Sequence, residues 1–232
     1  MKKFKKILRS TIILVIIAAL LSTNALAASG SRYFLVADDV STTGKTQINN
    51  ICSNLTNNLG YTNTYTYLPT PATIHSNLPN YYVSVVHGHA NPGIISCRQS
   101  NGTDSYYYSA NTTGNSISAY AANALSDVKL ILFICCYSAL GPNNSTSNGF
   151  VATANNRGAK VAIGFRNTVA AGEWWANYFI TALPYYTIAG AMSTADTYFA
   201  YYYPSWSGGT SSPDNTSNRY SLGSTGSYIT NL

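Results

Sequence analysis

Apolar and polar positions follow two patterns along this chain, and together they predict strands that alternate with helices. Short apolar or β-branched runs indicate strands at residues 32–39, 61–68, 81–90, 129–136 and 159–165. Apolar residues that recur at intervals of three and four predict helices at residues 48–59, 117–128, 150–157, 173–183 and 188–202. Such an alternation is typical of an α/β fold with helices on a mainly parallel sheet.

Two of these runs have the same form and carry the reactive side chains. Residues 129–136, KLILFICC, are apolar without alternation and end in two cysteines, while residues 81–90, YYVSVVHGHA, end in His-Gly-His. Continuous apolar runs suit central parallel strands covered on both faces. The helix predicted at 117–128 is long enough to connect them as parallel neighbours. A thiol and an imidazole are therefore expected side by side where α/β sheets place their ligands.

The remaining segments receive simpler interpretations. Residues 61–68 alternate aromatic and Thr positions, as an edge strand does. His75 lies among polar neighbours and is interpreted as a surface histidine, and Tyr106, Tyr107 and Tyr108 are placed in a polar loop. The Ser, Gly and Thr-rich residues 205–232 are expected to form a loose cap or a disordered tail.

The first residues have the layout of a secretory signal peptide. An apolar run at 11–21 follows five basic residues, and Ala25-Leu26-Ala27 offers a cleavage site after Ala27. The run is short for a membrane span, so no stable membrane anchor is expected after cleavage. Removal of residues 1–27 takes five of the 13 Lys and Arg residues and none of the 7 Asp and Glu, which leaves about +1. That balance gives no basic patch for nucleic acid.

The predicted organisation is a signal peptide at 1–27, one domain at 28–204 and the tail at 205–232. The roughly 205 residues after Ala27 suffice for a single core. Only 9% of the residues are charged, so neutral polar groups must solvate most of the surface. The expected localisation is extracellular.

Export to an oxidising compartment makes disulfides a question for Cys52, Cys97, Cys135 and Cys136. Adjacent strand residues point to opposite faces, so Cys135 and Cys136 are not expected to bond to each other. Cys52 falls on the apolar face of a helix as a buried thiol, and a bridge between Cys97 and Cys135 remains open. His87, His89 and these cysteines also leave a metal site open, although no Cys-x-x-Cys spacing is present.

A cysteine near a histidine suits nucleophilic catalysis, because the thiolate attacks a carbonyl and the imidazole moves the proton. The interval from His89 to Cys136 is 47 residues. That is close to the spacing of about 50 by which the histidine precedes the cysteine in caspases.

These residues resemble the caspase-like cysteine peptidases of clan CD, nearest to bacterial CHAT and gingipain-type domains. In that group one hydrophobic strand ends in His and usually Gly, and a later strand ends in a small residue and Cys. Residues 83–90, VSVVHGHA, and 131–136, ILFICC, are similar to these two strand ends. Residues 89–95 and 149–164 resemble the segments that follow the histidine and the nucleophile, so the resemblance covers 81–169.

The resemblance implies a three-layer sandwich in which Cys136 is the nucleophile and His89 the general base and acid. The backbone N–H groups of Cys136 and Ala90 would hold the oxyanion. Ala90 stands where the family usually has glycine, and His87 with Gly88 would restore that glycine if His87 were the base. Arg166, or Asp38 with Asp39, would contact a charged substrate side chain, with solvated loop charge as the alternative.

The sequence thus predicts a secreted cysteine endopeptidase that cleaves polypeptide substrates through an acyl-enzyme and needs no cofactor. Three alternatives remain. One is a catalytically inactive binding protein of the same fold, and the second is a metal-binding His/Cys site. The third is a structural export protein with Cys136 in a disulfide.

Overall fold

The computed structural model describes residues 32–37, 42–98, 102–111 and 115–232. Contacts divide the chain into residues 1–30 and a compact unit at 31–232, and every described helix and strand belongs to that second unit. Asp38 and Asp39, and the predicted signal peptide, lie outside the described residues. In the part that is described, none of the helices is long and apolar enough to cross a membrane.

A six-stranded sheet runs through this unit in the order β2-β1-β3-β7-β8-β9, as counted over the described residues. All neighbouring pairs are parallel except β8 and β9, which are antiparallel. The strand bounds are β1 Arg32–Ala37, β2 Thr62–Tyr67, β3 Val83–Gly88, β7 Leu130–Cys135, β8 Val161–Phe165 and β9 Arg219–Gly223. The predicted α/β class with a mainly parallel sheet is therefore confirmed, and β2 lies at the edge as expected.

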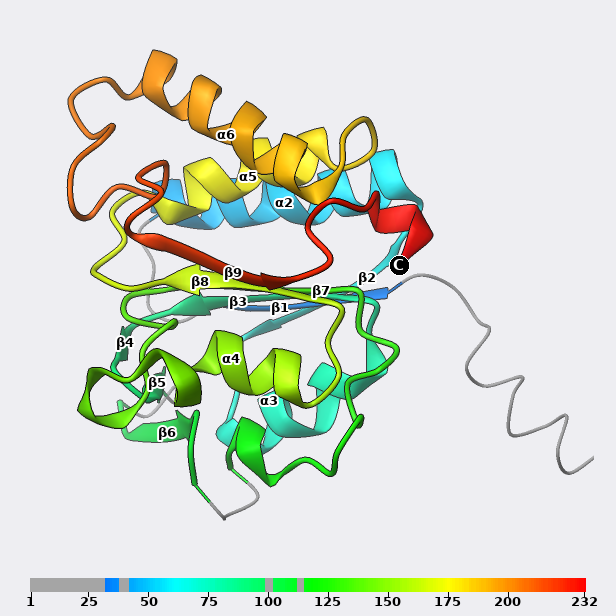
Figure 1. Cartoon of the computed structure of the whole chain (residues 1–232), viewed down its shortest axis with the longest axis vertical. Helices are drawn as coiled ribbons and strands as arrows, with labels where there is room; N and C mark the ends of the chain where they lie inside the picture. The colour runs from blue at the N-terminus through cyan, green and yellow to red at the C-terminus, as the bar shows by residue number, and fades with distance from the viewer. Residues whose placement is uncertain (1–31, 38–41, 99–101, 112–114) are drawn as a thin grey trace, which may run out of the picture. The chain divides into compact units, whose positions relative to one another are not determined.

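The central position of β7 follows from its sequence. Every residue of LILFIC is buried, because helices cover both faces of the sheet (Figure 1). Leu130, Leu132 and Ile134 pack into one hydrophobic cluster, and the residues between them pack into a second cluster on the other face.

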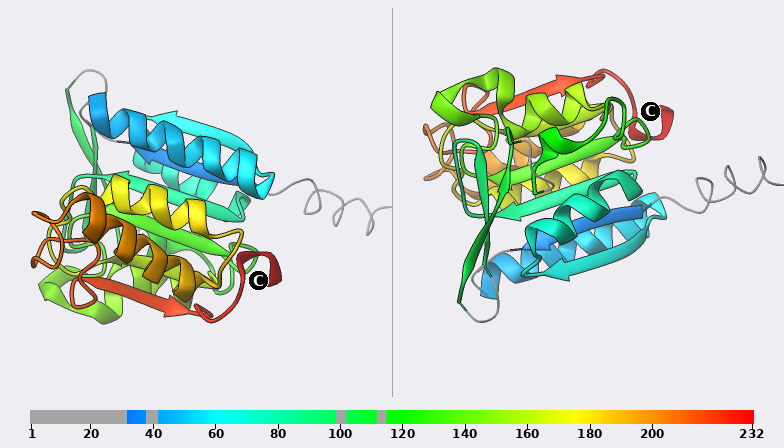
Figure 2. Two further views of the ribbon diagram at one scale, coloured as in Figure 1. Left: turned by 90° about the horizontal axis from the view of Figure 1, so that it is seen from above. Right: turned by 90° about the horizontal axis from the view of Figure 1, so that it is seen from below.

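One face of the sheet, here called the α5 face, is covered by three helices. They are α2 Thr42–Leu59, α5 Gly172–Ala182 and α6 Ile188–Tyr202, with α5 between the other two in Figure 2. Helix α2 buries Ile48, Ile51 and Leu55 against the sheet, and it ends as predicted at Gly60, whose φ of 68° is left-handed. Helices α5 and α6 add Trp175, Phe179 and Phe199 to the core on this face.

The opposite face, called the α4 face, is covered by α3 Pro71–Asn77, α4 Phe150–Asn156 and a small antiparallel sheet (Figure 1). The small sheet contains β4 Ala90–Asn91, β5 Ile94–Arg98 and β6 Asp104–Tyr108. The 3-10 turns are η1 Leu78–Asn80, η2 Ile117–Ala119, η3 Pro142–Asn144, η4 Thr146–Asn148 and η5 Ile229–Asn231. Helices and sheets thus form an α/β sandwich.

The prediction of a crossover helix at residues 117–128 is wrong. The segment contains η2 followed by successive turns, although Ile117, Leu125 and Val128 are buried as the pattern required. Asn123 has a φ of 62°, which a helix interior does not accommodate, and the N–H of Leu125 donates to the carbonyl of Arg157 instead of to its own turn. Burial at helical spacing is achieved here by turns.

Two segments assigned to loops belong to sheets. Tyr106, Tyr107 and Tyr108 lie in β6, where Tyr107 is buried and Tyr106 is exposed, so the expected loop is a half-buried strand. Within residues 205–232, β9 pairs with all of β8 and completes the main sheet. The expectation of a loose or disordered tail is therefore also wrong.

His75 is half-buried, which corrects its interpretation as a surface histidine. Its ring stacks on Tyr120 with centroids 4.2 Å apart, and the Tyr120 hydroxyl donates to the His75 carbonyl. Burial lowers the pKa of His75, against a smaller opposing effect of a backbone hydrogen bond with Ser116. Its role is packing on the α4 face, beneath β6.

Candidate active site at the ends of β3 and β7

The register of the two central strands brings the histidine and cysteine segments together. Gly88 lies opposite Cys135 and His87 opposite Ile134, so Cys136 is the first residue beyond the end of β7. The thiol of Cys135 is fully buried on the α4 face and lies 3.4 Å from the carbonyl oxygen of Val86. Cys136 points the other way, as strand alternation predicts, and is partly exposed.

Cys136 is the first residue of a tight turn at residues 136–139. Tyr137 has a φ of 55°, an uncommon conformation for a bulky residue. Its N–H donates to the carbonyl of Asn167 at 2.9 Å, and the buried hydroxyl of Ser138 accepts from the N–H of Phe165 at 3.0 Å. These bonds fasten the turn to the end of β8, so the surrounding structure holds the strained residue directly after the thiol.

The segment between β8 and α5 contacts the thiol directly. The N–H of Val169 donates to Sγ of Cys136 at 3.4 Å, and the Val169 side chain packs against the core of the α5 face. Buried Asn218 fixes this segment, because its side-chain amide accepts from Asn167 N–H at 2.8 Å and donates to the Thr168 carbonyl at 3.1 Å. These bonds hold the N–H of Val169 in a fixed position beside the sulfur of Cys136.

His87 lies beside the carboxylate of Glu173 in the first turn of α5. Nε2 of His87 is 3.7 Å from Oε2 of Glu173, with the two side chains only 11% and 20% exposed. Burial alone would raise the pKa of Glu173, but the imidazole of His87 and the glutamate's own backbone N–H lower it below its ordinary value. A carboxylate in the first helical turn is also favoured by the helix dipole.

The other ring nitrogen of His87 is available. Within the described residues, Nδ1 of His87 is buried and has no hydrogen-bond partner. Val83 and Val85 belong to the core of the α5 face, so alternation along β3 places His87 on that face, the one on which Cys136 and Glu173 lie. Nδ1 of His75 on the α4 face is likewise buried and unpaired, so what distinguishes His87 is its place beside Glu173 on the face where Cys136 lies.

His89 has different surroundings. It is exposed beyond the end of β3, and its carbonyl accepts from Ser96 N–H at 2.9 Å. Its side chain lines a pocket of about 260 Å³ together with Ala90, Asn91, Ile94, Ser96 and Tyr106. Ala90 begins β4, where it pairs with Ile95. The structure thus brings His87, Cys136 and Glu173 to one face of the sheet, and the role of His89 stays a prediction.

Arg166 interacts with the edge strand and its preceding loop. Its guanidinium donates to the Ser217 carbonyl at 3.2 Å and lies 4.5 Å from the ring centroid of Tyr220. Asp38 and Asp39, the alternative contacts for a charged substrate, lie outside the described residues.

Cysteine and histidine positions also bear on the metal and disulfide alternatives. All four cysteines are described, and none of them forms a disulfide. Within the described residues, no group of three or more His, Cys, Asp or Glu side chains is placed to hold a metal ion. Cys97 and Cys135 are both buried in the core of the α4 face, where they act as small apolar side chains.

No model of a protein family matches the chain, and no curated protein matches it significantly.

Three residues of this site were not found from the sequence. Glu173 is the one glutamate among the 7 acidic residues and lies in the first turn of an otherwise uncharged helix, which is a usable signal. Val169 acts through its backbone, so its side chain carries no indication of the contact. Asn218 lies 50 residues from the Thr168 carbonyl that it holds, and one of many Asn residues gives no local signal.

Proposed function

We propose that this chain is a cysteine peptidase with a caspase-like fold, in which Cys136 is the nucleophile and His87 the general base and acid. The observation that carries the proposal is the His87–Glu173 pair on the face of the sheet where Cys136 lies. A carboxylate that orients an imidazole beside a partly exposed thiol is an arrangement suited to acyl transfer.

The reaction begins with proton transfer from the Cys136 thiol to Nδ1 of His87. The thiolate then attacks the carbonyl carbon of the scissile peptide bond, and a tetrahedral oxyanion forms. As the carbon–nitrogen bond breaks, the imidazolium returns the proton to the departing amine, and a thioester to Cys136 remains. Water, activated by the neutral imidazole, hydrolyses this thioester and restores the thiol.

Glu173 has a positioning role in this scheme. Its carboxylate faces Nε2 of His87 at 3.7 Å, so it stabilises the imidazolium and directs Nδ1 away from itself. No hydrogen bond joins Nδ1 to the sulfur in the structure, and such catalytic contacts often tighten only when substrate is bound.

The choice of His87 over His89 rests on burial and partners. His87 has a carboxylate partner and a buried unpaired nitrogen, whereas His89 is exposed beyond the end of β3. The resemblance places the second oxyanion donor directly after the catalytic histidine, and for His87 that residue is Gly88. We also propose that the protein acts outside the cell, since the residues before Ala27 have the layout of a signal peptide.

A peptide library tests this function on the chain from Ala28 onward. Wild type is expected to cleave library peptides, and Cys136→Ala to lose cleavage while Cys135→Ala keeps it, since the Cys135 thiol is buried on the other face. Equal cleavage by wild type and Cys136→Ala would overturn the proposal. No cleavage by folded wild type, together with no labelling of Cys136 by electrophilic peptides, would favour a binding protein of the same fold.

A further inference from the structure

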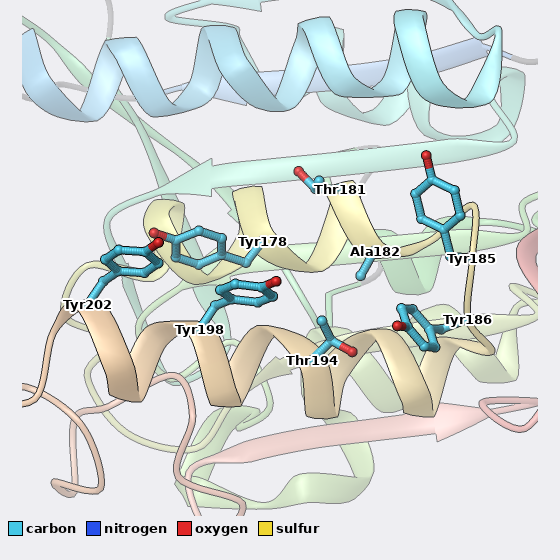
Figure 3. A pocket seen from close by; sticks show the side chains of 8 residues that line it. All are labelled: Tyr178, Thr181, Ala182, Tyr185, Tyr186, Thr194, Tyr198 and Tyr202. Carbon is cyan, nitrogen blue, oxygen red and sulfur yellow. The ribbon is translucent and has the colours of Figure 1, made fainter.

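Exposed tyrosines line a groove between α5 and α6, called here the tyrosine groove (Figure 3). It has a volume of about 470 Å³ and is lined by Tyr178, Thr181, Ala182, Tyr185, Tyr186, Thr194, Tyr198 and Tyr202. Tyr185 is 69% exposed and Tyr202 is 56% exposed, although burial of such rings would stabilise the fold. A cluster of exposed aromatic side chains on one surface indicates a binding site.

Ring contacts hold part of the groove in a fixed arrangement. Tyr178 stacks on Tyr198 with centroids 5.5 Å apart and on Tyr202 with centroids 5.9 Å apart. The planes of Tyr198 and Tyr202 lie within 8° of each other, and Figure 3 shows the three rings gathered at one end of the groove. Rings ordered before binding lose little entropy when a ligand packs between or upon them.

The chemistry of the lining defines the ligand. It offers tyrosine hydroxyls beside aromatic faces, and among the described residues that line it there is no Lys, Arg, His, Asp or Glu. A neutral ligand that presents apolar rings and hydrogen-bond acceptors complements it. A polyproline II helix has these properties, because its carbonyl groups make no internal hydrogen bonds and its conformation is already ordered.

Two other ligand classes fit less well. The groove lies between two helices, so it has no unpaired strand edge to which an extended peptide could add. Sugar rings also stack on tyrosine, but their neighbouring hydroxyls are best recognised by amide or carboxylate groups, and the lining contains none.

Contacts along α5 connect the groove to the proposed active site. Glu173 lies in the first turn of α5, the helix that carries Tyr178, and the five residues from Glu173 to Tyr178 span about 7.5 Å. Between the two sites, Trp174 packs on Tyr203 with centroids 5.1 Å apart. Burial, with smaller contributions from Tyr178 and from the charge of Glu173, raises the pKa of Tyr203 to about 12. A polypeptide of modest length therefore reaches both sites.

We propose that the tyrosine groove binds a proline-rich segment of the polypeptide substrate and holds it for cleavage at Cys136. The binding step stands on the groove alone, whereas its link to cleavage rests on the proposed peptidase function.

Binding is tested on the Cys136→Ala protein, so that cleavage does not interfere. A neutral twelve-residue proline-rich peptide and an alanine-rich peptide of equal length are titrated, with chemical shifts or tyrosine fluorescence as the readout. We expect the proline-rich peptide to bind at least tenfold more tightly. Adding Tyr198→Ala should weaken its binding about tenfold, and Tyr198→Phe should weaken it less, because the ring remains. Tyr65→Ala, an exposed tyrosine on β2, is the matched control and should change nothing.

Equal affinity for the two peptides, or no effect of Tyr198→Ala in a folded protein, would overturn the proposal. Tighter binding of a neutral N-acetylglucosamine oligomer, or self-association lost in Tyr198→Ala, would assign the groove to a glycan or to a second copy of the chain and overturn it equally. Folding of each variant is checked by its thermal midpoint.

Cleavage assays distinguish a failure of the groove proposal from a failure of the proposed peptidase function. If wild type cleaves a substrate with a proline-rich extension, Tyr198→Ala should raise its KM about tenfold with little change in kcat, and the KM of the unextended substrate should not change. If Cys136→Ala binds the proline-rich peptide but wild type cleaves nothing, the groove stands and the peptidase function fails. If wild type cleaves but Tyr198→Ala leaves the KM of the extended substrate unchanged, the peptidase function stands and the role of the groove in cleavage fails.

Discussion

The two faces of the central sheet use the same residue types for different purposes. On the α4 face, Cys135 is buried with its sulfur 3.4 Å from the carbonyl oxygen of Val86, and the ring of His75 stacks on Tyr120. On the α5 face, Cys136 and His87 lie at the ends of neighbouring strands beside Glu173. Because residue type is equal on both sides, we expect strand parity and the helix that covers each face to decide which cysteine and histidine are reactive.

The largest effect should come from replacing each of the two adjacent cysteines in turn. Cys136→Ala is expected to lower kcat/KM for peptide cleavage by a factor of about 1,000 or more, because the nucleophile is gone. Cys135→Ala should keep activity and lower the free energy of unfolding by about 1 kcal/mol, since it removes a buried sulfur. The comparison fails if Cys135→Ala is the inactive variant while it remains folded.

The two histidines give the next largest contrast. His87→Ala should reduce kcat by roughly 100-fold or more through loss of the general base, whereas exposed His89→Ala should change it less than about threefold. Steady-state kinetics on both variants provide the measurement. The opposite ranking would assign the general base to His89 and the oxyanion donor to Ala90, as the family resemblance implies.

Replacement of Glu173 tests orientation rather than proton transfer. Glu173→Gln should lower kcat about fivefold, because a partly exposed pair of this kind contributes about 1 kcal/mol. Asp127→Asn, which changes an exposed carboxylate elsewhere, should have no effect. A loss of the same size in a His87→Ala background would show that Glu173 does not act through His87.

The same pair predicts a dependence of stability on pH. The pKa of Glu173 is lowered in the folded state, so its contribution is complete above its unfolded value of about 4.3 and is lost as the pH falls through the folded value. Urea unfolding between about pH 6 and pH 3 should therefore show the advantage of wild type over Glu173→Gln shrink toward the acid end. A difference that grows on acidification contradicts this sign.

A smaller effect is expected where α5 meets β7. A Cβ added to Gly172 would lie 2.7 Å from Cγ2 of Ile134 and 2.8 Å from Cγ2 of Val169, so the helix start must shift. Gly172→Ala should cost about 1 to 3 kcal/mol in unfolding free energy and reduce activity a few-fold. Gly226→Ala, where nothing lies within 4 Å, is the matched control. Equal stability of the two variants would show that this contact is not tight.

Much of the fold could be predicted because its signals are local. The continuous apolar run of β7 and the spacing of α6 specify their own burial, and α6 Ile188–Tyr202 has the bounds expected for it. The crossover segment was missed because the helical spacing of Ile117 and Leu125 is equally well satisfied by turns once Asn123 adopts a left-handed conformation. Edge strand β9 was missed because its stability comes from pairing with β8.

The candidate site, like the fold, could be predicted from the sequence only in part. The ends of β3 and β7, and the opposite directions of Cys135 and Cys136, follow from the sequence alone. The partner of His87 could not be predicted from the sequence, because Glu173 follows His87 by 86 positions and reaches it only when α5 packs on the sheet. Long-range pairs of this kind depend on tertiary packing that no local pattern encodes.

The rate of covalent labelling tests the central claim most directly. A peptide with an electrophilic end group is incubated with wild type, His87→Ala and His89→Ala, and mass spectrometry locates and times the adduct. We expect one adduct, on Cys136, that forms at the wild-type rate in His89→Ala and at least about 100-fold more slowly in His87→Ala. An adduct on another cysteine, or equal rates in wild type and His87→Ala, would contradict the assignment of Cys136 and His87.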